Sequence, residues 1–382
     1  NMDEFFEIRV AGLKHQIKFG RETISSDGLT PVQTLEEINQ IAHKQVQEQY
    51  EILNDVLLPA LAKEDIRFLR RSEWTEEQND WLADYFDREI LPIINPIGLD
   101  PSHPFPRLVN KSLNFIVELD GKDAFGRETG LAIVPAPRSL PRLIKLPSEM
   151  SQGDDIAFLS SIIHAHASQL FPGMSVKGCY QFRLTRNADF ELEQDDMVDL
   201  ASALKGELLS RRFGDAVRLE LADNCPDHLV QFLLKEFNLT ESELYQVRGP
   251  VNLSRLTELA KHIDKPQLLH PSFAPGQPKK IKNTNQIFSL IKQKDILLLH
   301  PFQSFTPVID FLRQAAKDPD VIAIKQTLYR SGADSEIVVA LVDAARRGKE
   351  VTVVIELRAR FDEAENIELA SRLQEAGAVV VY

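Results

Sequence analysis

The C-terminal part of the chain places arginines directly after apolar segments. Arg330 closes one segment, 321–329, and Arg358 and Arg360 follow another, 351–357. Arginine carries a permanent charge and planar N–H donors that match phosphate oxygens, so this pattern favours a phosphate-binding rim. The alternative is a set of surface ion pairs with the neighbouring carboxylates: Asp334, Asp362 and Glu363.

Alternating strands and helices are expected to position these arginines. The expected strands are 295–300, 321–329, 351–357 and 378–382, and the expected helices are 308–316, 335–347 and 365–376. Pro307 suits a first helical position, Ser335 is a candidate N-cap, and Gly348 suits a helix end. This alternation predicts a parallel sheet with right-handed crossovers. Ligands bind beyond the carboxyl ends of such strands, where Arg330 and Arg360 fall.

The N-terminal region, residues 1–93, is expected to form a small helical domain. Apolar residues recur every three to five positions over 33–58, which is typical of one helix face. A second helix is expected to begin at Thr75, where Gln78 completes a capping box, and Pro92 ends the helical region.

The middle region, residues 94–285, is expected to form an α+β domain. Its expected strands are 113–119, 131–134 and 180–185, and its expected helices are 155–170, 196–212 and 228–237. Prolines and a glycine interrupt the stretch 271–280. We therefore expect a third, incomplete domain over 286–382.

Composition excludes several classes of protein. The 382 residues are 43% hydrophobic and 26% charged, which is typical of globular chains and excludes a disordered or fibrous one. The net charge is −13, with the acidic excess in residues 1–278, whereas residues 279–382 hold 15 basic and 14 acidic side chains. An acidic chain argues against general nucleic-acid binding, although a local basic channel for an anionic substrate is compatible with it.

Apolar runs and cysteines indicate the compartment. The longest apolar runs, such as 296–299 and 351–355, are far shorter than the about 20 residues of a membrane-spanning helix, and no signal peptide is visible. Cys179 and Cys225 cannot form a disulfide framework and lack metal-site spacing. We predict a cytoplasmic protein with no transmembrane segment, and leave peripheral membrane association open.

Other motifs carry little chemistry. There is no glycine-rich phosphate loop and no Ser/His/Asp arrangement. His164 and His166 are two residues apart on an expected helix, so they point to different faces and make a poor metal pair. Arg183 and Thr185 share one face of an expected strand, and an exposed charge is the simpler interpretation there.

Long motifs in the chain resemble a known family. The sequences LHPF at 299–302, IAIKQTLYR at 322–330 and VVIELRARFDE at 353–363 closely resemble the first C-terminal domain of type 1 polyphosphate kinases. NMDEFF at 1–6 resembles the N-terminal helical domain of that family, and FRLTRNAD at 182–189 resembles a motif of its middle, or head, domain.

The resemblance implies a multidomain α and α/β fold. The family has an N-terminal helical domain, a head domain and two related C-terminal domains with a phospholipase-D-like fold. The chain would hold the first two and a third with a parallel-rich sheet, truncated at its fourth strand. It starts at Asn1 without a start methionine and stops within an expected strand at Tyr382, which predicts a fragment of a longer protein.

The resemblance also implies an activity and its partners. The family transfers the terminal phosphate of ATP reversibly to polyphosphate, through a phosphohistidine and with Mg²⁺. ATP or ADP, polyphosphate and a second copy, in a homodimer or higher oligomer, are the implied partners. The nucleophilic histidine would lie beyond Tyr382, and none of the nine histidines here matches it. The fragment alone is therefore expected to be inactive.

Three residues match family site positions. Asn1 matches an ATP-contacting asparagine, and Arg330 and Arg360 match arginines that the family assigns to a magnesium–nucleotide site. A guanidinium has no lone pair to offer a metal ion, so we expect both arginines to hold phosphate oxygens near Mg²⁺. Further basic residues are candidates to line the polyphosphate path: Arg183, Arg186, Lys279, Lys280 and Lys282.

Two other functions stay open at this point. A phospholipase-D-like phosphodiesterase would carry paired His-x-Lys motifs, each with a following Asp, and neither occurs in these 382 residues. A non-catalytic phosphate-binding or oligomerisation module is the second alternative.

Overall fold

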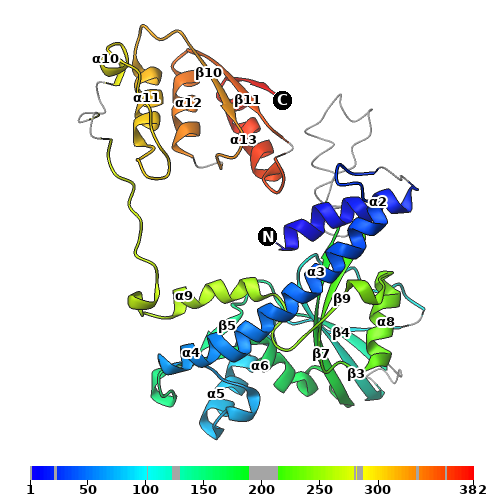
Figure 1. Ribbon diagram of the computed structural model, residues 1–382. Coiled ribbons are helices and arrows are strands. Elements are labelled where there is room, and N and C mark those ends of the chain that lie inside the picture. Colours follow the sequence, from blue (N-terminus) through cyan, green and yellow to red (C-terminus); the bar gives the residue numbers. More distant parts are fainter. Residues whose placement is uncertain are drawn as a thin grey trace. The chain divides into compact units, whose positions relative to one another are not determined.

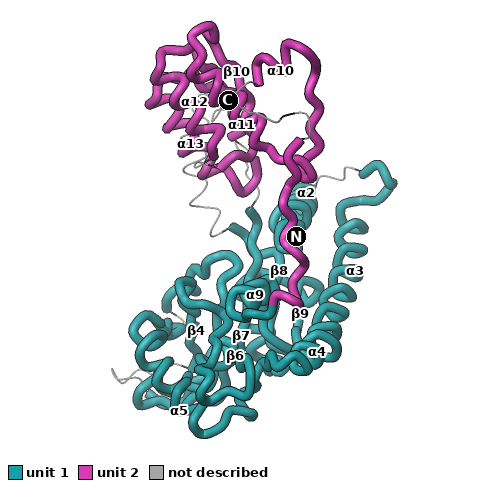
Figure 2. The backbone as a smooth tube through the Cα atoms, turned by 90° about the vertical axis from the view of Figure 1, so that its left-hand side faces the viewer, with its two compact units in different colours: residues 1–191, 209–265 teal, residues 192–208, 266–382 magenta. Residues whose placement is uncertain are grey.

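The computed structural model describes residues 2–20, 24–100, 102–122, 130–188, 214–278, 281, 287–332, 335–357 and 359–382. The chain forms two compact units (Figure 2). Unit 1 comprises residues 1–191 and 209–265, and unit 2 comprises residues 192–208 and 266–382. The domain limits expected at 93/94 and 285/286 stay a prediction.

Helices dominate the first part of unit 1 (Figure 1). They are α1 Met2–Glu4, α2 Ala11–Lys18, α3 Pro31–Glu51, α4 Leu58–Lys63 and α5 Glu76–Tyr85, with π-helical turns at Phe5–Val10, Ile52–Leu57 and Phe86–Ile90. Capping boxes begin α3, at Thr30 and Gln33, and α5, at Thr75 and Gln78. The helix expected over 33–58 and the capping box expected at Thr75 are confirmed.

A six-stranded sheet forms the centre of unit 1, in the order β2-β4-β3-β7-β8-β9. Its strands are β2 Ile97–Gly98, β3 Leu113–Gly121, β4 Leu131–Pro135, β7 Met174–Arg186, β8 Ala216–Ala222 and β9 Leu244–Val247. Of the described neighbours in this sheet, β8 and β9 alone pair in parallel, joined by a crossover through α8 Asp227–Phe237. Because successive strand residues face opposite ways, Ile116 packs with α8 while Phe115 and Val117 pack with the N-terminal helices.

A smaller sheet in unit 1 corrects one expectation. Its order is β1-β6-β5, formed by β1 Ile66–Phe68, β6 Asp154–Phe158 and β5 Leu143–Lys145, and it is followed by α6 Leu159–Ala165. The helix expected over 155–170 is therefore wrong in its first four residues. Asp155 is held by the guanidinium of Arg67 on the neighbouring strand, through two hydrogen bonds of 2.7 Å. Pairing with β1 and β5 overrides the local helical pattern, and the helix expected over 196–212 lies outside the described residues.

Unit 2 contains the expected parallel sheet, in the order β10-β11-β12. Its strands are β10 Ala323–Leu328, β11 Glu350–Ile355 and β12 Val379–Val381, and its helices are α10 Ile287–Ile291, α11 Thr306–Lys317, α12 Glu336–Arg346 and α13 Glu363–Glu375. The Ser335 hydroxyl accepts a hydrogen bond from the backbone N–H of Ile337 and caps α12, as predicted. Gly348 follows α12 with a positive φ of 82°, a conformation that glycine adopts without steric cost.

The strand expected over 295–300 does not form. Leu297 is 93% exposed, and no strand among the described residues pairs with this segment. The N–H of Leu299 donates to the side-chain carbonyl of Gln303, and its C=O accepts from the backbone N–H of Gln303, each at 2.8 Å. These local bonds use groups that a strand ladder would need, so the described sheet has three strands rather than four.

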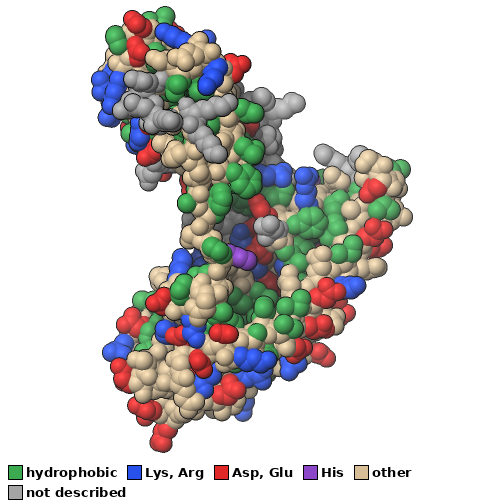
Figure 3. All heavy atoms as spheres, turned by 60° about the vertical axis from the view of Figure 1, so that its left-hand side comes forward, with side chains coloured by type: hydrophobic (Ala, Val, Ile, Leu, Met, Phe, Trp, Pro, Cys, Tyr) green, Lys and Arg blue, Asp and Glu red, His purple; other side chains and the backbone are tan. Residues whose placement is uncertain are grey.

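The surface of unit 1 carries side chains of both charge signs, and both cysteines of the chain are buried. On the face drawn in Figure 3, the coloured acidic and basic side chains of unit 1 are interspersed, with hydrophobic groups among them. Burial raises the pKa of the Cys179 and Cys225 thiols to about 12, and both cysteines are free. Within the part of the chain that the structure describes, no helix combines the length and apolar character needed to cross a bilayer.

Candidate functional site

The arginines singled out from the sequence meet at one edge of the unit 2 sheet. β10 and β11 are parallel, and Leu328 at the end of β10 is the register partner of Ile355 at the end of β11. Arg330 and Arg360 follow these strand ends, and the Nη2 of Arg330 donates to the backbone carbonyl of Arg360 at 2.9 Å. The prediction that the two arginine-bearing segments meet at one edge of the sheet is therefore confirmed.

A buried amide ties the two strand ends together. Asn366 on α13 is 2% exposed, and its Nδ2 donates to the carbonyl of Tyr329 at 3.2 Å and to that of Glu356 at 2.8 Å. Sequence reasoning missed this residue. Its signal was a polar side chain four positions before Ala370 and seven before Leu373, on the buried face of an amphipathic helix.

Arg330 also forms one of the predicted surface ion pairs. Its Nε lies 2.9 Å from Oδ2 of Asp362 in an ion pair, and the side chains of Arg330 and Asp362 are 47% and 32% exposed. Its guanidinium carbon lies 5.4 Å from the ring centre of Tyr329. The ion-pair interpretation is thus confirmed for Asp362, whereas Asp334 lies outside the described residues and Glu363 is buried.

A strained residue lies inside the loop after β11. Phe361 has a φ of 71°, in the left-handed region that costs about 1–2 kcal/mol for a residue with a side chain. Its neighbours, the backbone carbonyl of Arg360 and the carboxylate of Asp362, both contact Arg330. The bend therefore directs two acceptors to one guanidinium, and such strain often occurs at functional sites.

Of the remaining residues that the sequence singled out for phosphate or nucleotide binding, some lie within the described residues and some do not. The side chain of Arg360 is exposed. Asn1, Arg358 and three candidate lysines, Lys279, Lys280 and Lys282, lie outside the described residues.

Arg183 has a different environment from the one expected. It is 2% exposed, its Nη1 donates to Oδ1 of Asp3 at 2.9 Å, and it pairs with Glu220 directly across the β7–β8 ladder. Burial alone would lower the pKa of Arg183, but the charges of Glu220 and Asp3 raise it above its ordinary value. The exposed-charge interpretation of Arg183 and Thr185 is wrong, since both are buried on the inner face of the strand.

Arg186 is also used internally. Its Nε donates to the carbonyl of Leu108 at 3.2 Å, and its Nη1 donates to that of Gly214 at 2.8 Å. These bonds join the end of β7 to two neighbouring segments, which is a structural use of the guanidinium.

The histidines and carboxylates do not assemble a metal site in the described part of the chain. No group of three His, Cys, Asp or Glu side chains there is arranged to hold a metal ion. His164 accepts a hydrogen bond from Arg71 at 3.0 Å, while His166 stacks on Phe86. At the arginine edge, Asp362 is already paired with Arg330. These residues fit phosphate oxygens better than a metal ion, because guanidinium groups only donate hydrogen bonds.

Comparison with known families assigns all three regions. Family models match residues 1–69 (Polyphosphate kinase N-terminal domain), 77–259 (Polyphosphate kinase middle domain) and 286–382 (Polyphosphate kinase C-terminal domain 1). The chain belongs to the polyphosphate kinase family. The resemblance seen in the sequence motifs is confirmed, and this family is favoured over a phosphodiesterase or a non-catalytic module.

Individual polyphosphate kinases match over the whole chain. Those of Pseudomonas syringae pv. tomato and Pseudomonas aeruginosa are 66% and 63% identical to it over 383 residues, 52% and 56% of their own lengths. The crystal structure of polyphosphate kinase from Porphyromonas gingivalis matches with a TM-score of 0.78 at 26% identity, covering 100% of this chain and 53% of that one. The expected multidomain α and α/β fold is confirmed, and the chain spans about half the length of these relatives.

Proposed function

We propose that this chain is part of an ATP:polyphosphate phosphotransferase, which transfers the terminal phosphate of ATP reversibly to polyphosphate. The observation that carries the proposal is the meeting of Arg330 and Arg360 at the carboxyl edge of a parallel sheet, in a chain of the polyphosphate kinase family. The activity belongs to the longer protein, because the chain corresponds to about half of each relative.

Arg330 is suited to exchange its carboxylate partner for phosphate. An exposed ion pair such as Arg330–Asp362 contributes only about 0–1 kcal/mol, so an incoming polyanion can compete with it. Among the described residues, Nη1 of Arg330 has no hydrogen-bond partner. Its N–H groups can therefore donate to a phosphate oxygen. The exposed Arg360 adds a second positive charge at the same edge.

Phosphoryl transfer needs this kind of site more than it needs covalent chemistry from most of the protein. Its catalysis depends on positioning the phosphates and neutralising their charge. In the proposed assignment, Arg330 and Arg360 orient phosphate oxygens, Asn1 contacts the nucleotide, and Mg²⁺ is held through the phosphates. The nucleophilic histidine, the homodimer and the cytoplasmic location belong to the same proposal.

The decisive experiment uses the full-length enzyme. Arg330→Ala and Arg360→Ala should each lower histidine phosphorylation and polyphosphate synthesis by up to about 10³-fold, the lower range for arginines that stabilise phosphoryl transfer. Arg330→Lys should restore binding better than turnover, because lysine keeps the charge but loses the planar fork.

A matched control comes from the other end of β11. Arg347 is an exposed arginine paired with Asp343 at 2.9 Å, and it precedes the strand rather than following it. Arg347→Ala should leave the rates unchanged. Near-normal rates for the Arg330 and Arg360 variants, with folding intact, would show that these arginines are only surface ion-pair residues.

The nucleotide contact of Asn1 has its own test. In the full-length enzyme, Asn1→Ala should weaken ATP binding by about 1–3 kcal/mol, the cost of an unsatisfied buried polar partner. Polyphosphate binding should hardly change. A loss of thermal stability with unaltered ATP affinity would instead assign Asn1 to helix capping.

A further inference from the structure

β9 is the open edge of the large sheet in unit 1. Among the described strands it pairs only with β8, and the carbonyl of Val247 accepts from the N–H of Asp223 on the β8 side. Backbone groups of successive strand residues point in opposite directions, so the N–H and C=O of Gln246 face away from β8. Among the described residues, neither of these two groups has a hydrogen-bond partner.

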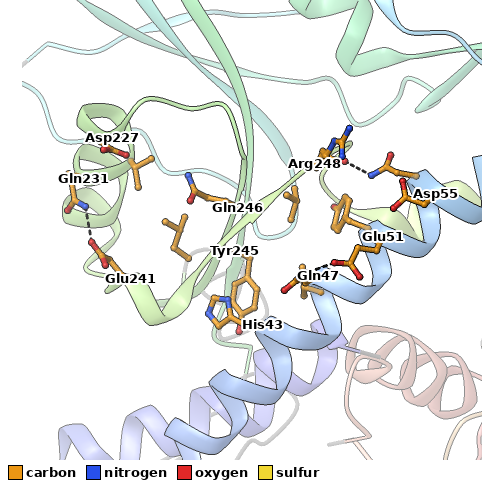
Figure 4. Close-up of a pocket in the computed structure, with 16 residues that line it drawn as sticks. His43, Gln47, Glu51, Asp55, Asp227, Gln231, Glu241, Tyr245, Gln246 and Arg248 are labelled. Atoms are coloured by element: carbon orange, nitrogen blue, oxygen red, sulfur yellow. Dashed lines mark hydrogen bonds between the residues drawn. The ribbon is translucent and has the colours of Figure 1, made fainter.

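A groove of about 700 Å³ runs along this edge, between α3 on one side and β9 with α8 on the other (Figure 4). α3 and the π-helical turn that continues it, Ile52–Leu57, contact the residues that flank the strand at its two ends. The Nε2 of His43 donates to the carbonyl of Ser242 at 2.9 Å, and the Nδ2 of Asn54 donates to the carbonyl of Arg248 at 2.9 Å. The helix therefore spans the strand and leaves its middle, around Gln246, open to the groove.

The groove is acidic. Four exposed carboxylates line it, one from the end of α3, one from the π-helical turn Ile52–Leu57 and two from the α8 side: Glu51, Asp55, Asp227 and Glu241. In the described part of the chain none of them forms an ion pair, and two accept only from the neutral amides of Gln47 and Gln231. Of the described residues that line the groove, Arg248 is the single Lys or Arg. An uncompensated negative lining favours cations and repels polyphosphate, so this groove is separate in its chemistry from the arginine edge.

The floor of the groove is aromatic and partly polar. Tyr245 is fully buried and stacks on the ring of His43, with centres 4.1 Å apart and planes 7° from parallel. Its hydroxyl has no hydrogen-bond partner among the described residues. The stacked rings of Tyr245 and His43 therefore form part of the lining of the groove.

We propose that this groove binds an extended peptide segment rich in lysine and arginine, which adds to β9 as a further strand. The main chain of the peptide pairs with Gln246, as in other cases of strand addition to a sheet edge. At about 3.3 Å per residue, four to six residues cover the strand, and basic side chains on the peptide reach the carboxylates on both walls. The proposal is independent of the proposed phosphotransfer.

The test measures fluorescence polarisation of three labelled hexapeptides. The first alternates Lys and Val, the second alternates Glu and Val, and the third is the Lys–Val peptide with its central backbone nitrogens methylated. The Lys–Val peptide should bind saturably at low salt, and the Glu–Val peptide should not bind. Methylation should weaken binding by about tenfold, because it removes main-chain donors while keeping every charge.

Variants of the chain separate charge from strand pairing. Glu51→Gln with Asp55→Asn should weaken binding of the Lys–Val peptide by about tenfold at low salt. Asp80→Asn with Asp84→Asn, on α5 of the same unit, removes the same charge elsewhere and should have little effect. Gln246→Pro deletes the outward N–H of an edge strand and fixes φ, and it should weaken binding, whereas Gln246→Ala, which removes only the side chain, should not.

Three results would overturn the proposal. Equal binding of the Lys–Val and Glu–Val peptides would remove the charge argument, and equal binding of the methylated peptide would remove the strand pairing. A change of molecular mass in solution for the Gln246 or Glu51/Asp55 variants, without peptide, would assign the groove to contacts between copies of the chain.

Discussion

The buried arginines of unit 1 and the strand-end arginines of unit 2 have the same chemistry but differ in their exposure to solvent. Arg183 and Arg218 are buried in the sheet and share the carboxylates of Glu220 and Asp3. Arg330 and Arg360 lie at the surface, and among the described residues Arg330 pairs with one carboxylate, Asp362, that water also reaches. Solvent access and the number of carboxylate partners, rather than residue type, decide which arginines can exchange a protein carboxylate for a ligand.

The energetic consequence follows from desolvation. Removing one member of a buried ion pair strands an uncompensated charge away from water, which costs several kcal/mol. Removing one member of an exposed pair leaves a charge that water solvates, which costs about 0–1 kcal/mol. The first cluster should therefore dominate stability, and the second should dominate ligand binding.

The largest effect is expected at Arg183. Arg183→Ala leaves Glu220 and Asp3 without their main partner, and it should lower the free energy of unfolding of unit 1 by about 3–5 kcal/mol. Both tryptophans, Trp74 and Trp81, lie in unit 1, so fluorescence in a urea titration reports this transition. Arg330→Ala is the control and should not move it. A loss below about 1 kcal/mol at Arg183 would mean that water enters the cluster.

A smaller loss of stability is expected at the strand ends. Asn366→Ala removes both hydrogen bonds that join Tyr329 and Glu356, and it should destabilise unit 2 by about 1–3 kcal/mol. Ser371→Ala on the same helix loses only one bond, to the carbonyl of Ile367, and serves as the control. Far-UV circular dichroism should show the loss while the tryptophan transition of unit 1 stays in place. An unchanged unit 2 would contradict the tie between the strands.

The Arg330–Asp362 pair can be opened without removing the arginine. Asp362→Asn should tighten binding of tripolyphosphate by up to about fivefold, because the competing carboxylate charge is gone. Asp343→Asn, which releases Arg347 at the other end of β11, should leave affinity unchanged. Titration calorimetry at two salt concentrations measures both. Weaker binding in Asp362→Asn would instead show that the carboxylate orients Arg330 for the ligand.

The smallest effect is a pH dependence in unit 1. Burial lowers the pKa of His166 below its ordinary value of about 6.5, and its Nε2 has no partner in the described part of the chain. Between the lowered pKa and about 6.5, the unfolded chain binds more protons, so stability falls as the pH falls through that window. His166→Gln should flatten this part of the profile.

The matched control for this profile is an exposed side chain that carries no titratable group. Asn79 on α5 is exposed, and Asn79→Ala should leave the slope of stability against pH as it is. Urea midpoints by tryptophan fluorescence at several pH values measure both variants. An unchanged slope in His166→Gln would place the proton uptake elsewhere in unit 1.

Much of unit 2 could be predicted because its signals are local. The apolar runs at 321–329 and 351–357, the cap at Ser335 and the helix end at Gly348 each depend on a few neighbouring residues, and all are confirmed. The edge shared by Arg330 and Arg360 follows from the parallel order of the strands. This part of the candidate site needed no tertiary information beyond that order.

Long-range contacts decided what the sequence did not reveal. β6 is a strand because Asp155 meets Arg67, 88 positions away in the chain. Segment 295–300 is not a strand because the backbone N–H and C=O of Leu299 form hydrogen bonds with Gln303 instead of with a neighbouring strand. A pattern of apolar or charged residues indicates which face of a helix or strand is buried. It does not indicate which segment of the chain packs against that face.

The sequence by itself determined the family, the alternating helices and strands of residues 306–382, and the placement of two arginines beyond parallel strands. Only the tertiary structure decided that Arg183 is buried against Asp3 and Glu220, and that Asn366 joins the strand ends. Periodicity is encoded within a few residues, whereas the solvent access and ion pairing of a side chain depend on segments that are distant in sequence and meet only in the fold.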